Sequence, residues 1–281
     1  MSHDSSRLDR SPHRPPVPPG VDLSRAHPAR MYDYYLHGRD NFPIDREEAD
    51  RVLRGFPDLR TSVLEGRAFL GRAVGYLLED AGIDQFLDIG AGLLQGGSTH
   101  EIARGLGRQV RVVYVDNDPV VVSHAHSMID GVTENRTAYT CGDLRDPLAV
   151  LQQVRGTQVL DLDRPVGLVL SGVLHFVADD ERPHEIVDFL LAALAPGSYL
   201  LVSHATGDHS PHSPTALEAA YRQSGTARHV RSRCEVQRFF ARTEPVPPGV
   251  VDLSHWQTDH LPQPRPALGA VACYGAVGRR T

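Results

Sequence analysis

The alternation of short apolar runs with helical segments constrains the fold of this chain more than any other feature of its sequence. Runs typical of strands lie at 86–90, 110–116, 137–141, 166–171 and 199–203. Between them, apolar residues recur at helical spacing over about 98–107, 119–129, 147–155 and 182–195. Strands that alternate with helices of this length predict βαβ units and a parallel sheet. Because the runs are apolar throughout, we expect helices on both faces of that sheet.

The regions before and after this alternating part have a different pattern. Residues 1–28 are rich in Ser, Arg, Asp and Pro, which predicts a disordered or extended arm. Residues 29–82 predict a helical cap segment, with helices at about 45–56 and 61–81 and a left-handed helix end at Gly82. We expect the α/β domain to span 83–281. Its last third predicts a loop over 205–215, helices over 214–223 and 232–241, and closing strands at 249–253 and 271–277, paired like a hairpin at the sheet edge.

Composition excludes several classes of protein. All 29 basic residues among the 281 are arginine, so the lysines that P-loop NTPases, protein kinases, pyridoxal enzymes and Schiff-base aldolases require are absent. The net charge of −6 gives no reason to expect a nucleic-acid partner. No apolar run reaches the roughly 18 residues that a membrane span needs. Cys141, Cys234 and Cys273 are far apart, which predicts a reduced, cytoplasmic chain with neither a disulfide framework nor a zinc site.

A row of polar residues follows the predicted strands at nearly constant spacing. Asp88, Asp116, Asp143 and Ser171 are separated by 28 residues (88 to 116), 27 (116 to 143) and 28 (143 to 171). The carboxyl ends of parallel strands line one edge of an open sheet, and ligands bind there. We therefore expect these four side chains to converge on one crevice.

The turn after the first strand reads Asp88-Ile89-Gly90-Ala91-Gly92. Its glycines allow the backbone to approach a ligand closely. The full GxGxxG dinucleotide fingerprint is absent because Gln95 stands at its last position. Asp88 would also repel a pyrophosphate, so it favours a ligand with a cationic or amine group.

The later strand ends suggest how a nucleoside could bind. Asp116, followed by Asn117, can accept hydrogen bonds from ribose hydroxyls, whereas Asp118 before Pro119 is a typical helix N-cap. Asp143 could accept from an exocyclic amine such as that of adenine. His175 lies just beyond the fourth strand, where it could act as a general base; a positioning or core histidine is the alternative.

Four of these motifs together resemble the class I S-adenosylmethionine-dependent methyltransferases. The motifs are FLDIGAG (86–92), VVYVDNDP (112–119), GDLRDP (142–147) and LVLSGVLHF (168–176). With ARMYDYYLHGRDNFPIDREEADRV, LAPGSYLLVSH and EVQRFFARTEPVPPGVVDLSHW, the chain more narrowly resembles a family from high-GC bacteria first catalogued as a domain of unknown function. The resemblance covers roughly residues 28–278. One departure is Leu94-Gln95, where that family usually has Pro-Thr.

The resemblance implies a fold and a cofactor site. The fold is a Rossmann-like α/β one, with a seven-stranded, mostly parallel sheet, helices on both faces, an antiparallel last strand and a helical N-terminal cap. The cofactor is S-adenosylmethionine. Its amino-acid half would face residues 88–92, its ribose Asp116 and Asn117, and its adenine Asp143 and Leu144, with Ser171 beside them. The residues expected to cap the cleft from the N-terminal segment are Tyr32, Tyr35, Asn41 and Phe42, although core packing of a helix is the alternative for that segment.

The function implied is methyl transfer to a small-molecule acceptor, mainly by positioning, with His175 as the base for an oxygen acceptor and no metal. A non-catalytic S-adenosylmethionine-binding or regulatory protein is the alternative, and a homodimer stays open. A dinucleotide-dependent oxidoreductase is disfavoured by Gln95 and Asp88.

Overall fold

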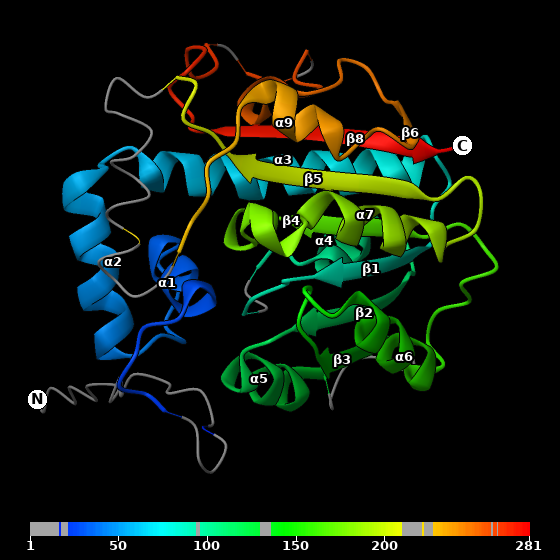
Figure 1. Cartoon of the computed structure of the whole chain (residues 1–281), viewed down its shortest axis with the longest axis horizontal. Coiled ribbons are helices and arrows are strands. Elements are labelled where there is room, and N and C mark those ends of the chain that lie inside the picture. The colour runs from blue at the N-terminus through cyan, green and yellow to red at the C-terminus, as the bar shows by residue number, and fades with distance from the viewer. Residues whose placement is uncertain are drawn as a thin grey trace, which may run out of the picture.

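A single mixed sheet organises the chain (Figure 1). The computed structural model describes residues 17, 22–93, 96–129, 136–209, 221, 227–259, 261–262 and 264–281. The sheet has eight strands in the order β3-β2-β1-β4-β5-β8-β6, with β7 also pairing with β8. The strands are β1 (Gln85–Ile89), β2 (Arg111–Asp116), β3 (Thr137–Cys141), β4 (Gly167–Ser171), β5 (Tyr199–Ala205), β6 (Thr243–Pro245), β7 (Val251–Asp252) and β8 (Cys273–Arg280). Strands β1 to β5 pair parallel with one another, and β8 runs antiparallel to β5.

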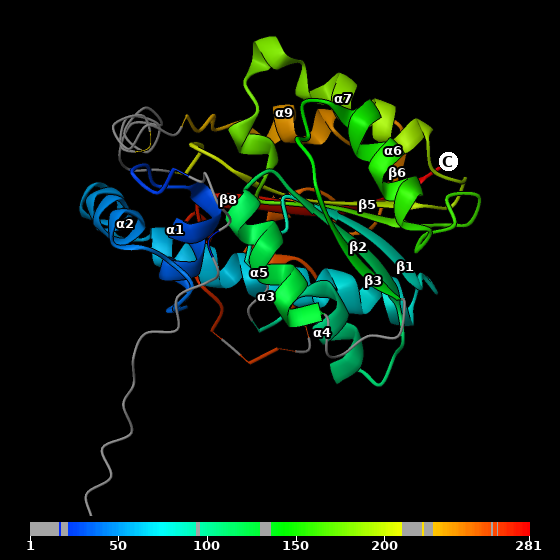
Figure 2. The ribbon, with the colours of Figure 1, turned by 90° about the horizontal axis from the view of Figure 1, so that it is seen from below.

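Helices cover both faces of the sheet, as Figure 2 shows. On one face lie α3 (Leu59–Glu79), α4 (Thr99–Gly105), α5 (Pro119–Ile129) and the short η3 (Leu253–His255); on the other lie α6 (Pro147–Thr157), α7 (Pro183–Ala192) and α9 (Arg233–Arg238). Side chains alternate between the two cores along each strand: Phe86 and Val112 face α3, whereas Leu87 and Val113 face α6 and α7. This burial on both faces is why the strands are apolar throughout.

The N-terminal helices α1 (Pro28–Tyr35) and α2 (Pro43–Gly55) form a third apolar cluster with the start of α3. Met31 and Tyr35 from α1 and Val52 from α2 are buried in it. The rest of α3 packs on the sheet through residues such as Phe69 and Leu77. Helix α3 therefore joins the N-terminal helices to the sheet in one continuous structure.

The fold class inferred from the sequence is confirmed, including the antiparallel last strand. The sheet has eight strands rather than seven because β6 and β7 both pair with β8. The two closing runs do pair antiparallel as expected, through β7 and β8. Their expected position at the sheet edge was wrong, because β8 lies inside the sheet between β5 and β6. Gly82 has the expected left-handed backbone, with φ 69°. The arm over 1–28 and the helix over 214–223 lie largely outside the described residues, as does Leu94-Gln95.

Candidate active site

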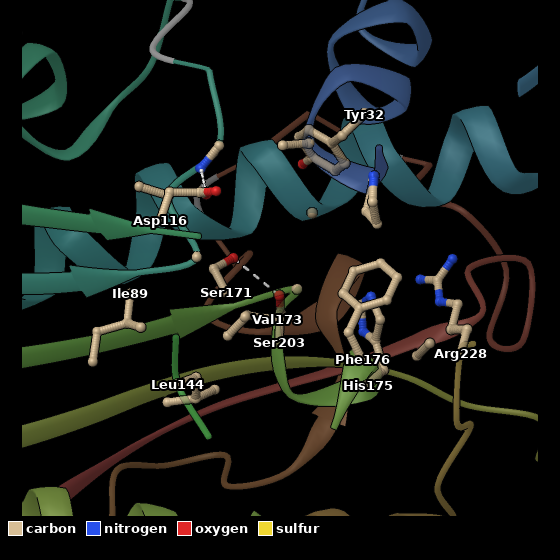
Figure 3. Close-up of a pocket in the computed structure, with 18 of the residues that line it drawn as sticks. Tyr32, Ile89, Asp116, Leu144, Ser171, Val173, His175, Phe176, Ser203 and Arg228 are labelled. Carbon is tan, nitrogen blue, oxygen red and sulfur yellow. Dashed lines mark hydrogen bonds between the residues drawn. The ribbon is translucent and has the colours of Figure 1, made fainter. Parts of the chain in front are cut away.

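A cavity of about 430 Å³ opens at the carboxyl ends of the parallel strands, under helix α1 (Figure 3). All but two of the side chains and turns predicted from the sequence line it. They are Tyr32, Tyr35, Asp88, Ile89, Gly90, Ala91, Gly92, Asp116, Asn117, Asp143, Leu144, Ser171 and His175. The exceptions are Asn41 and Phe42. The convergence of the strand-end side chains follows from the parallel register of β1, β2 and β4.

Asn41 and Phe42 lie between α1 and α2, where they have structural contacts. The Asn41 side-chain amide donates to Asp33 Oδ2 at 2.7 Å, and its oxygen accepts from Arg46 at 2.9 Å. Phe42 begins α2, and the Arg30 guanidinium lies 5.5 Å from the centre of its ring. The structure therefore does not bring these two residues to the cavity, and the core-packing alternative describes their position.

Asp88 is a buried carboxyl group at the end of β1, with 6% of the residue exposed. Thr99 Oγ1 donates to its Oδ2 at 2.8 Å. Burial raises the pKa of Asp88 to about 6, although the Thr99 hydrogen bond and the charge of Arg67 act to lower it. No cation among the described residues forms an ion pair with Asp88. Ionised Asp88 therefore has no cationic partner among the described residues, and the ammonium group of a ligand could supply one.

The glycine turn is held from both sides. Asp116 Oδ2 accepts a hydrogen bond from the Gly92 N–H at 2.8 Å, and the Gly92 carbonyl accepts one from Tyr139 Oη at 2.8 Å. Asp116 Oδ1 accepts from the Asp118 N–H at 2.9 Å. Burial raises the pKa of Asp116. One carboxylate thus fixes two strand-end turns while keeping further acceptor positions toward the cavity.

Asp118 has the capping contact expected from the sequence, since its Oδ1 accepts from the Val120 N–H at 2.9 Å. Its Oδ2 also lies 3.1 Å from Arg30 Nε, and both side chains are buried. The Arg30 Nη1 atom lies 3.6 Å from Asp45 Oδ2 on α2. Arg30 thereby connects the N-terminal helices to the turn that carries Asp116.

The third strand end supplies one polar and one apolar group. Asp143 is partly exposed and forms an ion pair with Arg145 at 2.9 Å, while Leu144 is buried in the cavity wall. Arg145 also forms an ion pair with Glu181 at 2.8 Å and donates a hydrogen bond to the Phe176 carbonyl at 3.2 Å. This wall therefore combines an apolar surface with a nearby acceptor.

His175 lies in the short helix η1 (Leu174–Phe176) and is buried. Burial and the nearby Arg228 hold the pKa of His175 well below its usual range, so its imidazole stays neutral. Its Nδ1 has no hydrogen-bond partner within the described part of the chain. His175 lines the cavity, and a neutral imidazole can accept a proton from a bound molecule.

Arg231 holds the η1 segment in place. Only 3% of Arg231 is exposed, and its guanidinium donates to the carbonyls of Leu174 (3.0 Å) and Val177 (2.8 Å) and pairs with Asp179. Arg231 Nη1 also lies 2.9 Å from His204 Nε2. Because His204 Nδ1 is 2.7 Å from the Ala205 carbonyl, the proton lies on Nδ1 and Nε2 accepts from Arg231. Burial lowers the pKa of His204 to about 3.

His204 lies inside β5 and is fully buried. His209, which follows the end of β5, contacts Asp252 at 3.0 Å. In the part of the chain that the structure describes, no three His, Cys, Asp or Glu side chains are grouped as a metal site.

Several residues that line the cavity were not predicted from the sequence. Ser203, at the end of the fifth predicted strand, could have been found by the same strand-end argument, and its Oγ lies 3.0 Å from Ser171 Oγ. Arg67 comes from α3, and Tyr221 and Arg228 come from the segment after β5. No spacing in the sequence places those three beside a strand end.

Comparison with known proteins identifies the family. Residues 16–281 match the family model described as S-adenosyl methyltransferase. The chain belongs to the S-adenosyl methyltransferase family. It is therefore an S-adenosylmethionine-dependent methyltransferase, as its motifs implied, and its cofactor is S-adenosylmethionine. None of the curated proteins matches this methyltransferase.

Two solved structures from high-GC bacteria are similar to the methyltransferase over nearly their whole length. A DUF574 family protein of Streptomyces avermitilis is 36% identical, with a TM-score of 0.83 over 92% of this chain and 98% of that one. A candidate methyltransferase of Thermobifida fusca is also 36% identical, with a TM-score of 0.86 over 94% and 98%. The magnesium protoporphyrin IX methyltransferase of Synechocystis, at 14% identity and a TM-score of 0.50 over 83% and 94%, shares the fold alone. Over the described residues, no helix is both long and apolar enough to span a membrane.

Proposed function

We propose that this methyltransferase binds S-adenosylmethionine along the carboxyl ends of β1, β2 and β3 and methylates a small molecule held between helix α1 and η1. One observation carries the proposal: two buried carboxyl groups, Asp88 and Asp116, face one cavity from neighbouring strands. Neither has an ion-pair partner within the described residues. Buried carboxylates of this kind favour a ligand that brings an ammonium group and hydroxyl donors.

The amino-acid half of the cofactor fits the region between Asp88 and Arg67. Asp88 would bind the ammonium group, and the Arg67 guanidinium the carboxylate. Arg67 acts electrostatically on Asp88, lies 5.7 Å from the centre of the Tyr32 ring and approaches the Gly97 carbonyl at 3.4 Å. Opposite charges at one end of the cavity match a zwitterion.

The nucleoside half fits the next two strand ends. Asp116 would accept from the ribose hydroxyls, with Asn117 beside it, and Leu144 would pack against the adenine ring while Asp143 accepts from its amine. The support for this order is geometric: β1, β2 and β3 are consecutive in the sheet, so their turns lie along one line. Tyr32 and Tyr35 from α1 close the cavity from above.

S-adenosylmethionine supplies a methyl group on a sulfonium, and it leaves as S-adenosylhomocysteine when an acceptor lone pair takes that methyl. The chain contributes position, exclusion of water and proton acceptance. His175, neutral and buried, would take the proton that an oxygen or nitrogen acceptor releases. Arg231 acts through η1 by fixing the orientation of that histidine. The cytoplasmic location, the homodimer and the absence of a nucleic-acid partner stay predictions.

The affinity for S-adenosylhomocysteine should fall about tenfold between pH 7 and pH 5. Because the pKa of Asp88 is about 6 in the free protein, most Asp88 carboxyls are protonated at pH 5, and binding the ammonium must displace that proton. The ammonium itself does not titrate in this window. Isothermal titration calorimetry at several pH values measures the effect.

The matched variants are Asp88→Asn and Asp143→Asn. Asp88→Asn should bind more weakly at pH 7 and lose the tenfold change that comes from the ionisation of Asp88. Asp143→Asn removes a partly exposed carboxylate and should keep the wild-type dependence. A tenfold change that persists in Asp88→Asn would rule out the proposed ammonium contact.

A further inference from the structure

Arg228 is a buried cation that faces the cavity and has no anionic partner among the described residues. Only 8% of it is exposed, and its Nε has no hydrogen-bond partner in the structure described. Its guanidinium lies 4.8 Å from the centre of the Tyr221 ring. The other buried arginines differ: Arg30 lies against Asp118 and Asp45, and Arg231 pairs with Asp179.

The position of Arg228 separates it from the cofactor end of the cavity. Arg228 acts electrostatically on Tyr35, His175 and Cys273, whereas Arg67 acts on Asp88. Burial raises the pKa of Tyr32, and both arginines act to lower it. Figure 3 shows Arg228 beside His175 and Phe176, away from Asp116. Arg67 is therefore placed to bind the cofactor carboxylate, and Arg228 remains for a second molecule.

The surroundings of Arg228 indicate what that second molecule is. Tyr35, Tyr221 and Phe176 line the cavity near it. Leu59 and Val63 also line the cavity and belong to the same apolar cluster as Tyr35 and Tyr221. These groups suit an apolar, flat body, whereas a buried guanidinium without a counter-ion suits an anion. Arginine binds a carboxylate through two parallel hydrogen bonds, which fixes orientation as well as position.

We propose that the methyl acceptor is a small aromatic acid whose carboxylate binds Arg228, so that its reactive atom is presented beside His175. This inference rests on the proposed function, because it assigns the second compartment of the same cavity. Arg228 then acts as a specificity determinant. The buried position of the Arg228 guanidinium is electrostatically favourable only when the acid is bound, because burying a cation without an anionic partner is costly.

The test uses the wild-type protein saturated with S-adenosylhomocysteine and two matched pairs of ligands. The pairs are 4-hydroxybenzoate with 4-hydroxybenzamide, and indole-3-acetate with indole-3-acetamide. Each pair keeps the ring and removes the charge. Calorimetry should show that at least one acid binds about tenfold or more tightly than its amide, the ratio expected for one charge-assisted contact.

Three variants test whether Arg228 causes the preference for the acid over the amide. Arg228→Gln should lose the preference for the acid, Arg228→Lys should keep part of it, and Arg233→Gln, an exposed arginine on α9, should keep all of it. Arg228→Gln should bind S-adenosylhomocysteine within about twofold of wild type, which shows that it is folded. Its midpoint of thermal unfolding should equal or exceed that of wild type because a buried lone charge has been removed.

The outcomes distinguish the two claims. If wild type does not bind S-adenosylhomocysteine, the proposed function fails. If S-adenosylhomocysteine binds but neither acid does, or the amides bind as well, the acid-acceptor inference is overturned and the proposed function stands. A preference that survives in Arg228→Gln, or a lowered midpoint in that variant, would also overturn the assignment of Arg228.

Discussion

Replacing Arg30 with methionine should lower the free energy of unfolding by about 3–5 kcal/mol at neutral pH. Arg30 Nε lies 3.1 Å from Asp118 Oδ2 and its Nη1 lies 3.6 Å from Asp45 Oδ2, and all three side chains are buried. Methionine fills a similar space but leaves two buried carboxylates without their cation. Chemical denaturation, followed by circular dichroism, measures the loss.

The exposed Arg164 is the matched control for this change. It forms an ion pair with the exposed Asp84 at 3.0 Å, so Arg164→Met should cost only about 0–1 kcal/mol. Burial already raises the pKa of Asp45, and removal of Arg30 should raise it further. The loss in Arg30→Met should therefore be smaller at pH 5 than at pH 8, because stability tied to a raised carboxyl pKa declines as pH rises. Equal losses in the two variants would contradict the account of Arg30.

Replacing Gly90 with alanine should weaken S-adenosylhomocysteine binding by about 100-fold or more, which corresponds to about 2.7 kcal/mol or more. Gly90 has φ 76°, a conformation that costs an L-residue about 1–2 kcal/mol. An added Cβ would also lie 2.6 Å from Cβ of Val173, so the turn or the β4–η1 segment must move. Calorimetry on the folded variant measures the change.

Gly82→Ala is the control that separates the cost of backbone strain from the cost of steric overlap. Gly82 has φ 69° and nothing within 4 Å of an added Cβ, so its replacement carries the backbone cost alone and lies outside the cavity lining. It should lose about 1–2 kcal/mol of stability and bind the cofactor product as wild type does. If Gly90→Ala also binds normally, the glycine turn does not contact the cofactor as proposed.

The convergence of the strand-end side chains on one cavity could be predicted from the sequence because these side chains belong to repeated units. Each βα unit places one polar residue at a strand end, so Asp88, Asp116, Asp143 and Ser171 could be assigned to one crevice from their spacing alone. Their burial, and the pKa of about 6 for Asp88, depend on packing that spacing does not encode.

The part of the cavity around Arg228 could not be predicted in the same way. Arg228 and Tyr221 follow β5 in the chain but do not stand at a strand end, so the spacing of the strands does not indicate that they line the cavity. Arg231 belongs to the same segment, and its role becomes visible only through its contacts with η1 and His204. For Asn41 and Phe42, an aromatic and polar stretch allowed two interpretations, and the sequence could not choose between them.

The position of β8 inside the sheet could not be predicted from the sequence either. The last strand was expected to be antiparallel through the resemblance, yet its neighbours depend on tertiary contacts. The pairs from Tyr199 with Arg279 to Ala205 with Cys273 place it directly against β5. The two closing runs suggested a hairpin-like pair, and β7 and β8 do pair antiparallel. The chain between them also supplies η3 and Trp256 to the core beside α3.

Calorimetric titration of folded wild-type protein with S-adenosylhomocysteine tests the central claim most directly, with Asp116→Asn and Asp146→Asn beside it. Asp146 caps α6 through the Ala149 N–H, and asparagine also caps helices, so this control removes one charge outside the cavity. We expect saturable binding to wild type and to Asp146→Asn, and a loss of about 1.5–3 kcal/mol in binding free energy in Asp116→Asn. No heat and no thermal shift with the folded wild-type protein would contradict it.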